Sequence, residues 1–170
     1  MRAVIYHGPR DVRLETLPRP RPGPGEVLVR LGAALTCGTD FKAYRRGHRV
    51  LLGDPPSPFG HELAGVVEEA GAGVTAFAPG DRVVVGNSAP CEGCFYCDRG
   101  QNFLCERLKL HNGAYADYDL VPAPIVRANL HRLPAGLSFE TAALAEPLAC
   151  ARHAVGAARV EAGETAAVVG

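Results

Sequence analysis

Four cysteines within 15 residues carry the clearest chemistry of this sequence. Two residues separate Cys91 from Cys94, two separate Cys94 from Cys97, and seven separate Cys97 from Cys105. Zinc in a structural site prefers four soft ligands in a tetrahedral arrangement, and such short gaps let successive turns point their sulfurs inward. Independent buried or redox-active thiols are the alternative, but the glycine bends and polar residues around these cysteines do not resemble a core. We therefore predict a closed structural zinc site that folds its loop and leaves no position for a substrate.

A second group of metal-binding residue types is spread along the chain. The segment Gly60-His61-Glu62-Leu63-Ala64-Gly65 is followed by Gly71 and Val74, Cys37-Gly38-Thr39-Asp40 precedes it, and Glu146-Pro147 follows the cysteine loop. A single histidine in a glycine-rich segment is typical of a structural or surface residue, whereas four ordered pieces, the cysteine loop included, are not. The combination resembles the zinc signature of the medium-chain alcohol dehydrogenases over nearly the whole chain.

This resemblance implies a second, catalytic zinc. It makes Cys37 and His61 two of the ligands, and it puts Glu146 in the third position, where simple alcohol dehydrogenases carry a second cysteine. A carboxylate there resembles the sorbitol, threonine and glucose dehydrogenase branch, in which Glu62 can also approach the metal. One thiolate and one carboxylate already cancel the charge of zinc, so a third anion would weaken its Lewis acidity. We therefore expect Glu62 to be an exchangeable ligand or a neighbour of the metal, and which glutamate binds directly stays open.

Two alternatives concern the segment that contains Glu146. A carboxylate is favoured at a helix N-terminus, so simple helix capping is the other interpretation of Glu146. Cys150 lies one helical turn later, but a small thiol on an alanine-rich helix is typical of packing, and we leave it out of the ligand set.

The resemblance also gives Thr39, Asp40 and Glu62 roles in catalysis. The hydroxyl of Thr39, two residues after the first zinc ligand, stands where the family places the first member of a proton relay. Asp40 matches the carboxylate that orients the ligand histidine, here His61, by accepting its other ring N–H. Ordinary turn chemistry is the alternative for both residues. Lys42 occupies the place where many relatives have a relay histidine, so the sequence defines no outer relay.

The elements that must position these residues are mainly strands. Up to about residue 135, short apolar runs are separated by glycine and proline, which is typical of a β-barrel or β-sandwich. Examples are Val27–Leu31, Leu63–Val67 and Asp81–Val85. A chain of 170 residues with 47% hydrophobic composition is long enough for one compact domain and a short extension.

After Pro134 the composition changes to helix formers. Ser138 is placed to cap a helix that runs through Leu144, and a proline at 147 suits the first turn of a second helix that ends near Ala158. Thr165–Gly170 resembles the first strand of a parallel sheet. Together with the resemblance, these patterns predict a mainly β fold. A GroES-like β-barrel catalytic domain with a few helices would occupy residues 1–153, and the linker helix end and truncated start of a Rossmann α/β domain would occupy residues 154–170.

Charge and hydropathy exclude several classes of function. The 18 basic and 18 acidic residues balance, which argues against nucleic acid or an anionic membrane surface as the partner. No apolar run is long enough to span a membrane and no secretory signal is found, so we expect a cytoplasmic protein. Six cysteines in a reducing compartment favour metal binding over disulfides.

The resemblance further implies two zinc ions per chain, and NAD or NADP together with a homodimeric or homotetrameric assembly in the full-length protein. No Gly-x-Gly-x-x-Gly fingerprint precedes Gly170. We therefore expect the 170-residue fragment alone to be inactive, and the choice between NAD and NADP cannot be inferred from it.

The predicted function is zinc-dependent oxidation of a secondary alcohol or polyol hydroxyl by hydride transfer to NAD(P). A simple-alcohol dehydrogenase of the same family is one alternative. A non-catalytic zinc-binding module, such as a nucleic-acid-binding ribbon, is another, and the neutral charge counts against it. A quinone-reductase-like relative without zinc is disfavoured by the presence of both ligand sets.

Overall fold

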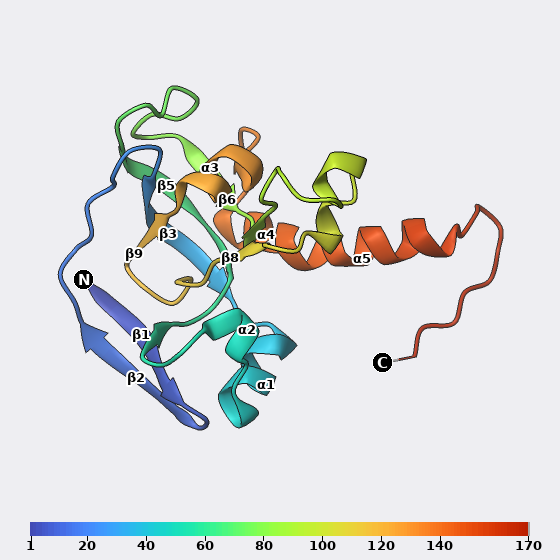
Figure 1. Ribbon diagram of the computed structural model, residues 1–170, viewed down its shortest axis with the longest axis horizontal. Helices are drawn as coiled ribbons and strands as arrows, with labels where there is room; N and C mark the ends of the chain where they lie inside the picture. Colours follow the sequence, from blue (N-terminus) through green and yellow to red (C-terminus); the bar gives the residue numbers. More distant parts are fainter. Residues whose placement is uncertain (170) are drawn as a thin grey trace.

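The computed structural model describes residues 1–169 as a mainly β structure with three antiparallel sheets and a few helices (Figure 1). The strands of the two larger sheets are β1 (Arg2–Gly8), β2 (Asp11–Thr16), β3 (Val27–Leu35), β4 (Ser57–Pro58), β5 (Glu62–Ala70), β6 (Arg82–Val85), β9 (Tyr118–Val121) and β10 (Leu130–Arg132). The third sheet pairs β7 (Ser88–Ala89) with β8 (Lys109–Leu110), and single 3-10 turns lie at Cys97–Arg99 and Asn102–Leu104. The α-helices are α1 (Gly38–Arg46), α2 (Arg49–Leu52), α3 (Ala123–Asn129), α4 (Phe139–Ala143) and α5 (Ala145–Ala158). The predicted fold, mainly β with a few helices, is confirmed.

The central sheet has the strand order β10-β6-β5-β3-β9 and brings distant segments together. Strands β3 and β5 pair along their whole length, from Val27 opposite Ala70 to Leu35 opposite Glu62. Because the pair is antiparallel, the end of β3 lies beside the start of β5. The residues after Leu35 and the residues before Glu62 are therefore neighbours in space. Gly65 permits the close pairing, since a Cβ there would collide with the carbonyl of Arg30.

The core lies mainly on one face of this sheet, beneath α3. Strand β3 begins with a run of three buried residues, Val27–Val29, and then alternates between exposed and half-buried positions. The first four residues of β5 are all buried. The buried members of the main cluster are Val27, Val29, Leu63, Val67, Val83, Val85, Ala89, Ala114, Val121, Ile125, Val126 and Leu130. The smaller sheet has the order β2-β1-β4, and a bridge from Ala3 to Ala116 connects β1 to the segment before β9. This packing fixes the ends of the strands that carry the candidate ligands.

The two C-terminal helices begin where the sequence predicted. The hydroxyl of Ser138 accepts the N–H of Thr141 at 3.2 Å, and this cap starts α4. Helix α5 contains Pro147 in its first turn and ends at Ala158. Helix α4 packs its buried alanines against β5 and β6, whereas α5 projects beyond the sheets and buries none of its side chains (Figure 1).

Two segments differ from the sequence-based expectation. Residues 38–46 form helix α1, which the sequence analysis did not predict; a turn was only the alternative interpretation of Thr39 and Asp40. Residues 165–169 have no regular secondary structure, because a strand needs a hydrogen-bonded neighbour and no strand of the described chain lies beside them. The final residue of that predicted strand, Gly170, lies outside the described residues. The division into two domains at residue 153 stays a prediction.

Candidate functional site

The four cysteines of the loop form a compact cluster, as their spacing predicted. The sulfurs of Cys91, Cys94, Cys97 and Cys105 all lie within 4.8 Å of one another. The Sγ atoms of Cys94 and Cys97 are 3.5 Å apart. A tetrahedral zinc site with bonds of about 2.3 Å separates its sulfurs by about 3.8 Å. The cluster therefore fits a structural zinc site with four thiolate ligands.

The electrostatics of this cluster also favour a cation. Backbone N–H groups of Cys97 and Glu106 lower the pKa of the Cys94 thiol to about 6. Burial and the neighbouring Cys94 thiol raise the pKa of Cys97 to about 11. The two pKa values move in opposite directions because neighbouring thiolates repel each other, and a divalent cation between them offsets that repulsion. Arg107 lies beside the cluster, 3.6 Å from the sulfur of Cys91, and its positive charge stabilises the thiolate form that binds a metal.

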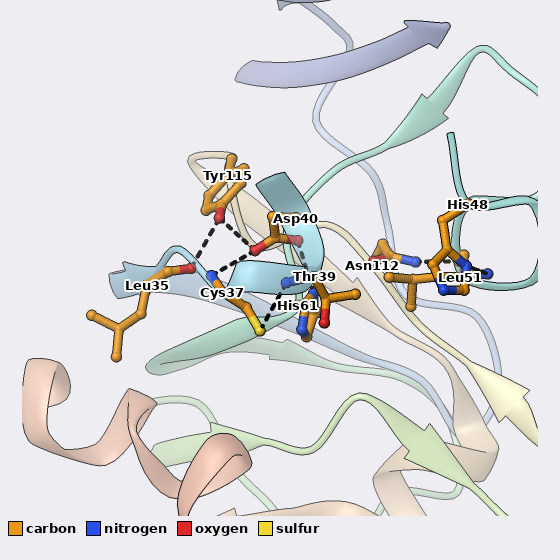
Figure 2. A network of polar contacts seen from close by, with 9 residues as sticks. All are labelled: Leu35, Cys37, Thr39, Asp40, His48, Leu51, His61, Asn112 and Tyr115. Carbon is orange, nitrogen blue, oxygen red and sulfur yellow. Dashed lines mark hydrogen bonds and ion pairs between the residues drawn. The ribbon is translucent and has the colours of Figure 1, made fainter. Parts of the chain in front are cut away.

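The second set begins at the junction of β3 and α1. Cys37 is the N-cap residue of α1, and its sulfur accepts the backbone N–H of Thr39 at 3.4 Å. The side chain of Asp40 reaches back and accepts the N–H of Cys37 at 2.9 Å (Figure 2). This reciprocal capping fixes the directions of both side chains.

His61 and Glu62 stand at the start of β5, beside this junction. One ligand atom each from Cys37, His61 and Glu62 lies within 4.8 Å of the others. The Nδ1 atom of His61 is 2.9 Å from Oδ1 of Asp40, although the ring N–H does not point straight at the oxygen, so the contact is an ion pair rather than an aligned hydrogen bond. The contact leaves the Nε2 atom of His61 to face a metal. The donor set of thiolate, imidazole and carboxylate suits zinc.

Asp40 and His61 are both almost fully buried, and each stabilises the charge of the other. Burial opposes the charged form of His61, but Asp40, Cys37 and Glu146 outweigh it and raise the pKa of the ring to about 9. Burial likewise works against the Asp40 carboxylate, but His61, Cys37 and Tyr115 hold its pKa below the usual range. The structure thus brings together the histidine and its predicted orienting carboxylate.

Glu146 lies in the first turn of α5, outside the group formed by Cys37, His61 and Glu62. Burial raises the pKa of the Glu146 carboxyl, the charge of His61 lowers it and the charge of Glu62 raises it. Glu146 is therefore near enough to His61 and Glu62 to interact with both. The structure therefore groups Glu62 more tightly than Glu146 with the other two ligands. Which glutamate binds a metal stays a prediction.

A cleft of about 490 Å³ lies next to these residues. Its wall is formed by the end of β6, by β10 and by the first turns of α5, and it includes Asn87, Ser88, His131, Glu146 and Cys150. These polar side chains lie among apolar ones such as Val85, Phe103 and Ala149, so the lining is mainly apolar with a few polar groups, as is typical of small-molecule sites. Lys42, in contrast, lies exposed on α1.

Tyr115 is one residue of the site that the sequence analysis missed. Its hydroxyl lies 2.8 Å from Oδ2 of Asp40 and 3.0 Å from the carbonyl oxygen of Leu35 (Figure 2). Asp40 and Tyr115 are 75 positions apart, so no spacing rule connects them. Only the folded structure shows the contact.

Comparisons with known proteins agree with this picture. The sequence model of the family described as "Alcohol dehydrogenase GroES-like domain" matches residues 23–134. The whole chain is 36% identical to the erythritol/L-threitol dehydrogenase of Mycolicibacterium smegmatis and covers 51% of that protein. It is 33% identical to the sorbitol dehydrogenase of Bacillus subtilis and covers 49% of it. Over 76% of the chain it is 39% identical to the L-threonine 3-dehydrogenase of Pyrococcus furiosus, of which it covers 37%.

Solved structures show the same similarity. The 2R,3R-butanediol dehydrogenase of Bacillus subtilis superposes on 96% of the chain with a TM-score of 0.84 and 30% identity, over 49% of that protein. An alcohol dehydrogenase of Escherichia coli in complex with NADH superposes on 94% of the chain with a TM-score of 0.82 and 28% identity, over 46% of that protein. The chain thus spans about half the length of these curated relatives that it matches over its full extent. Within residues 1–169, none of the helices is both long and apolar enough to cross a bilayer.

Proposed function

The chain belongs to the alcohol dehydrogenase GroES-like domain family, and from that premise we propose that it forms the metal-binding catalytic part of a zinc-dependent alcohol or polyol dehydrogenase. The observation that carries the proposal is the convergence of Cys37, His61 and Glu62 within 4.8 Å of one another. The other candidate ligand, Glu146, lines a cleft large enough for a small molecule. The buried carboxylate of Asp40 behind His61 supports it, because metal-binding histidines commonly donate their second N–H to such a group.

In this proposal each side chain has a separate task. Cys37, His61 and one of the two glutamates, Glu62 or Glu146, hold the metal. Zinc, when bound, supplies the Lewis acidity that makes a substrate hydroxyl easier to deprotonate. Asp40 keeps the imidazole in one orientation and one tautomer. The hydroxyl of Thr39 would relay the released proton, taking it up while it gives its own proton onward. NAD or NADP, when bound, would supply the hydride acceptor.

We propose a secondary alcohol or a polyol as the substrate. Support comes from the relatives, which are named for erythritol, L-threitol, sorbitol and butanediol. The cleft beside Glu146 is mainly apolar but includes the polar groups of Asn87, Ser88 and His131. These groups would pair with the further hydroxyls of a polyol, because unpaired polar groups in a closed site cost binding energy.

The proposal has further parts. Two zinc ions per chain, one at the cysteine cluster and one at Cys37 and His61, are supported by the two groups of ligand atoms. NAD or NADP in the full-length protein is supported by the family alone. A homodimer or homotetramer in the cytoplasm is part of the same proposal, and residues 1–170 alone are expected to be inactive.

The test uses a full-length protein that contains residues 1–170. The wild type should hold two zinc ions per chain and oxidise sorbitol, erythritol or butanediol faster than ethanol. His61→Ala should hold one zinc ion and lose turnover. A zinc content of one in the metal-replete wild type, with no oxidation of any alcohol, would favour a non-catalytic zinc module and contradict the proposal.

A further inference from the structure

Tyr115 contacts the carboxylate that stands behind the candidate metal ligand His61. Its hydroxyl has one hydrogen to donate and two acceptors within reach, Asp40 at 2.8 Å and the Leu35 carbonyl at 3.0 Å. The Asp40 carboxylate is the stronger acceptor because it is charged. The N–H of Cys37 donates to the same oxygen, Oδ2, at 2.9 Å. Two donors therefore hold Oδ2, and Oδ1 is left to face His61 (Figure 2).

The segment around Tyr115 also fixes the residues that precede His61. The N–H of Tyr115 donates to the carbonyl of Phe59 at 3.1 Å, and the N–H of Ala114 donates to the carbonyl of Gly60 at 3.1 Å. The tyrosine ring lies so close to Gly60 that an added Cβ would come within 2.9 Å of three ring atoms. Gly60 has a φ of +85°, which few other residues adopt. One residue therefore contacts both the helix that carries Asp40 and the loop that carries His61.

We propose that Tyr115 is a positioning residue for the metal site, acting through Asp40. Its hydroxyl holds the carboxylate so that Oδ1 stays opposite Nδ1 of His61, and this fixes the direction in which the imidazole presents its other nitrogen. The inference rests on the proposed metal site at Cys37 and His61. Asp40 is only 2% exposed, so water does not easily replace a lost donor, and a partly satisfied buried carboxylate moves or changes partners.

A purely structural role for Tyr115 would have a different consequence. The ring packs against Phe59 with centroids 5.7 Å apart, and this contact needs no hydroxyl. Tyr6 provides the matched case, since it also packs against Phe59, at 6.0 Å, and is buried. Within the described residues its hydroxyl makes no hydrogen bond to Asp40. Removing each hydroxyl in turn therefore separates packing from positioning.

The experiment compares Tyr115→Phe with Tyr6→Phe in the full-length protein. Zinc affinity of the second site is measured by competition with a chromophoric chelator, and ligand geometry by the absorption spectrum of the cobalt-substituted protein. Loss of a group that touches a metal-ligating histidine typically weakens metal binding about 10–100-fold. Because Tyr115 is one contact further away, we expect about threefold to tenfold weaker zinc binding and a changed cobalt spectrum in Tyr115→Phe. Tyr6→Phe should match the wild type in both.

A double-mutant cycle tests the route through Asp40. In an Asp40→Asn background, Tyr115→Phe should cause no further loss of zinc affinity, because the group that it holds is already altered. Unchanged affinity and spectrum in Tyr115→Phe, an equal loss in Tyr6→Phe, or a full additional loss in the Asp40→Asn background would each overturn the inference alone. If instead His61→Ala keeps the wild-type zinc content, both the proposed function and this inference are overturned.

Discussion

The two candidate metal centres are built by the chain in opposite ways. The cysteine cluster takes all four sulfurs from one loop, Cys91 to Cys105. The second centre takes its ligands from the end of β3 and the start of β5, and its other glutamate from α5. The first has an exposed arginine beside it, whereas the second has a buried carboxylate behind it. The local centre depends on its own loop, and the dispersed centre depends on the pairing of the whole sheet.

This difference fits the chemistry proposed for each centre. Four thiolates close the coordination sphere, so the cluster holds its loop together and takes no substrate. A mixed set of three protein ligands leaves one coordination position open for a substrate. Such a site needs ligands of fixed geometry, and buried hydrogen-bonding partners fix a ligand better than exposed ones. Removing a ligand should therefore affect mainly stability in one centre and mainly activity in the other.

The largest expected effect is that of His61→Ala on activity. Loss of the Lewis acid removes several kcal/mol of transition-state stabilisation, so polyol oxidation by the full-length protein should fall about 1000-fold or more. One zinc ion should be lost, as measured by metal analysis, with the melting temperature nearly unchanged. His7→Ala is the control, since His7 pairs with Glu15 on the smaller sheet and should keep both ions. Unfolding of His61→Ala would contradict the proposed separation.

Cys94→Ser should show the opposite pattern. The cluster loses its zinc and the loop loses its order, which we expect to cost about 3 kcal/mol of stability and to lower the melting temperature by about 10 °C. Metal analysis should find one zinc ion, and calorimetry should give the melting temperature. Cys150→Ser should change neither, because Cys150 lies outside the cluster. An unchanged melting temperature in Cys94→Ser would remove the structural role of the cluster.

A smaller effect decides between the two glutamates. If Glu146 is the third ligand, Glu146→Ala should lower zinc affinity and turnover about tenfold or more. Glu146→Cys should then keep zinc and part of the activity, because a thiolate has the same charge and binds zinc well. Zinc content and turnover on sorbitol, threonine, butanediol and ethanol are the measurements. Normal zinc and turnover in Glu146→Ala, with zinc lost in Glu62→Ala, would assign the third position to Glu62 and reduce Glu146 to a helix cap.

The smallest expected effect concerns Arg107, beside the cysteine cluster. Zinc with four thiolates carries a net charge of −2, which a nearby cation partly offsets. Arg107 is exposed, so solvent screens its charge, and Arg107→Ala should weaken zinc binding there only about twofold to fivefold. The effect should shrink in high salt. Arg99→Ala is the control, since Arg99 stacks on Phe95 and contacts no sulfur among the described residues. Equal losses in both variants would exclude the charge effect.

The sequence was most informative where the structure is local. Ligand spacing predicted the cysteine cluster, and the cap at Ser138 predicted the start of α4. Both features depend on contacts within a few residues. The composition after Pro134 likewise predicted α5, whose end at Ala158 was placed correctly.

The sequence was least informative at helix α1, whose start is unusual, and where distant segments meet. Helix α1 starts with the poor helix former Gly38, and its reciprocal cap of Cys37 and Asp40 does not match the usual serine or threonine pattern. The contact between Tyr115 and Asp40 spans 75 positions and exists only because the segment before β9 bonds to the loop before β5. Family resemblance placed His61 and Asp40 together, but residue spacing alone would not have done so.

The double role of Cys37, as helix cap and as candidate metal ligand, affects how a substitution at this position would be detected. Starting α1 requires only a side chain that accepts a backbone N–H, and serine, threonine, asparagine or aspartate does this at least as well as cysteine. Binding a soft metal requires the thiolate itself. A change from cysteine to serine at this position would therefore pass any screen for expression, solubility or secondary structure. Its only symptom would be a well-folded protein without its second metal.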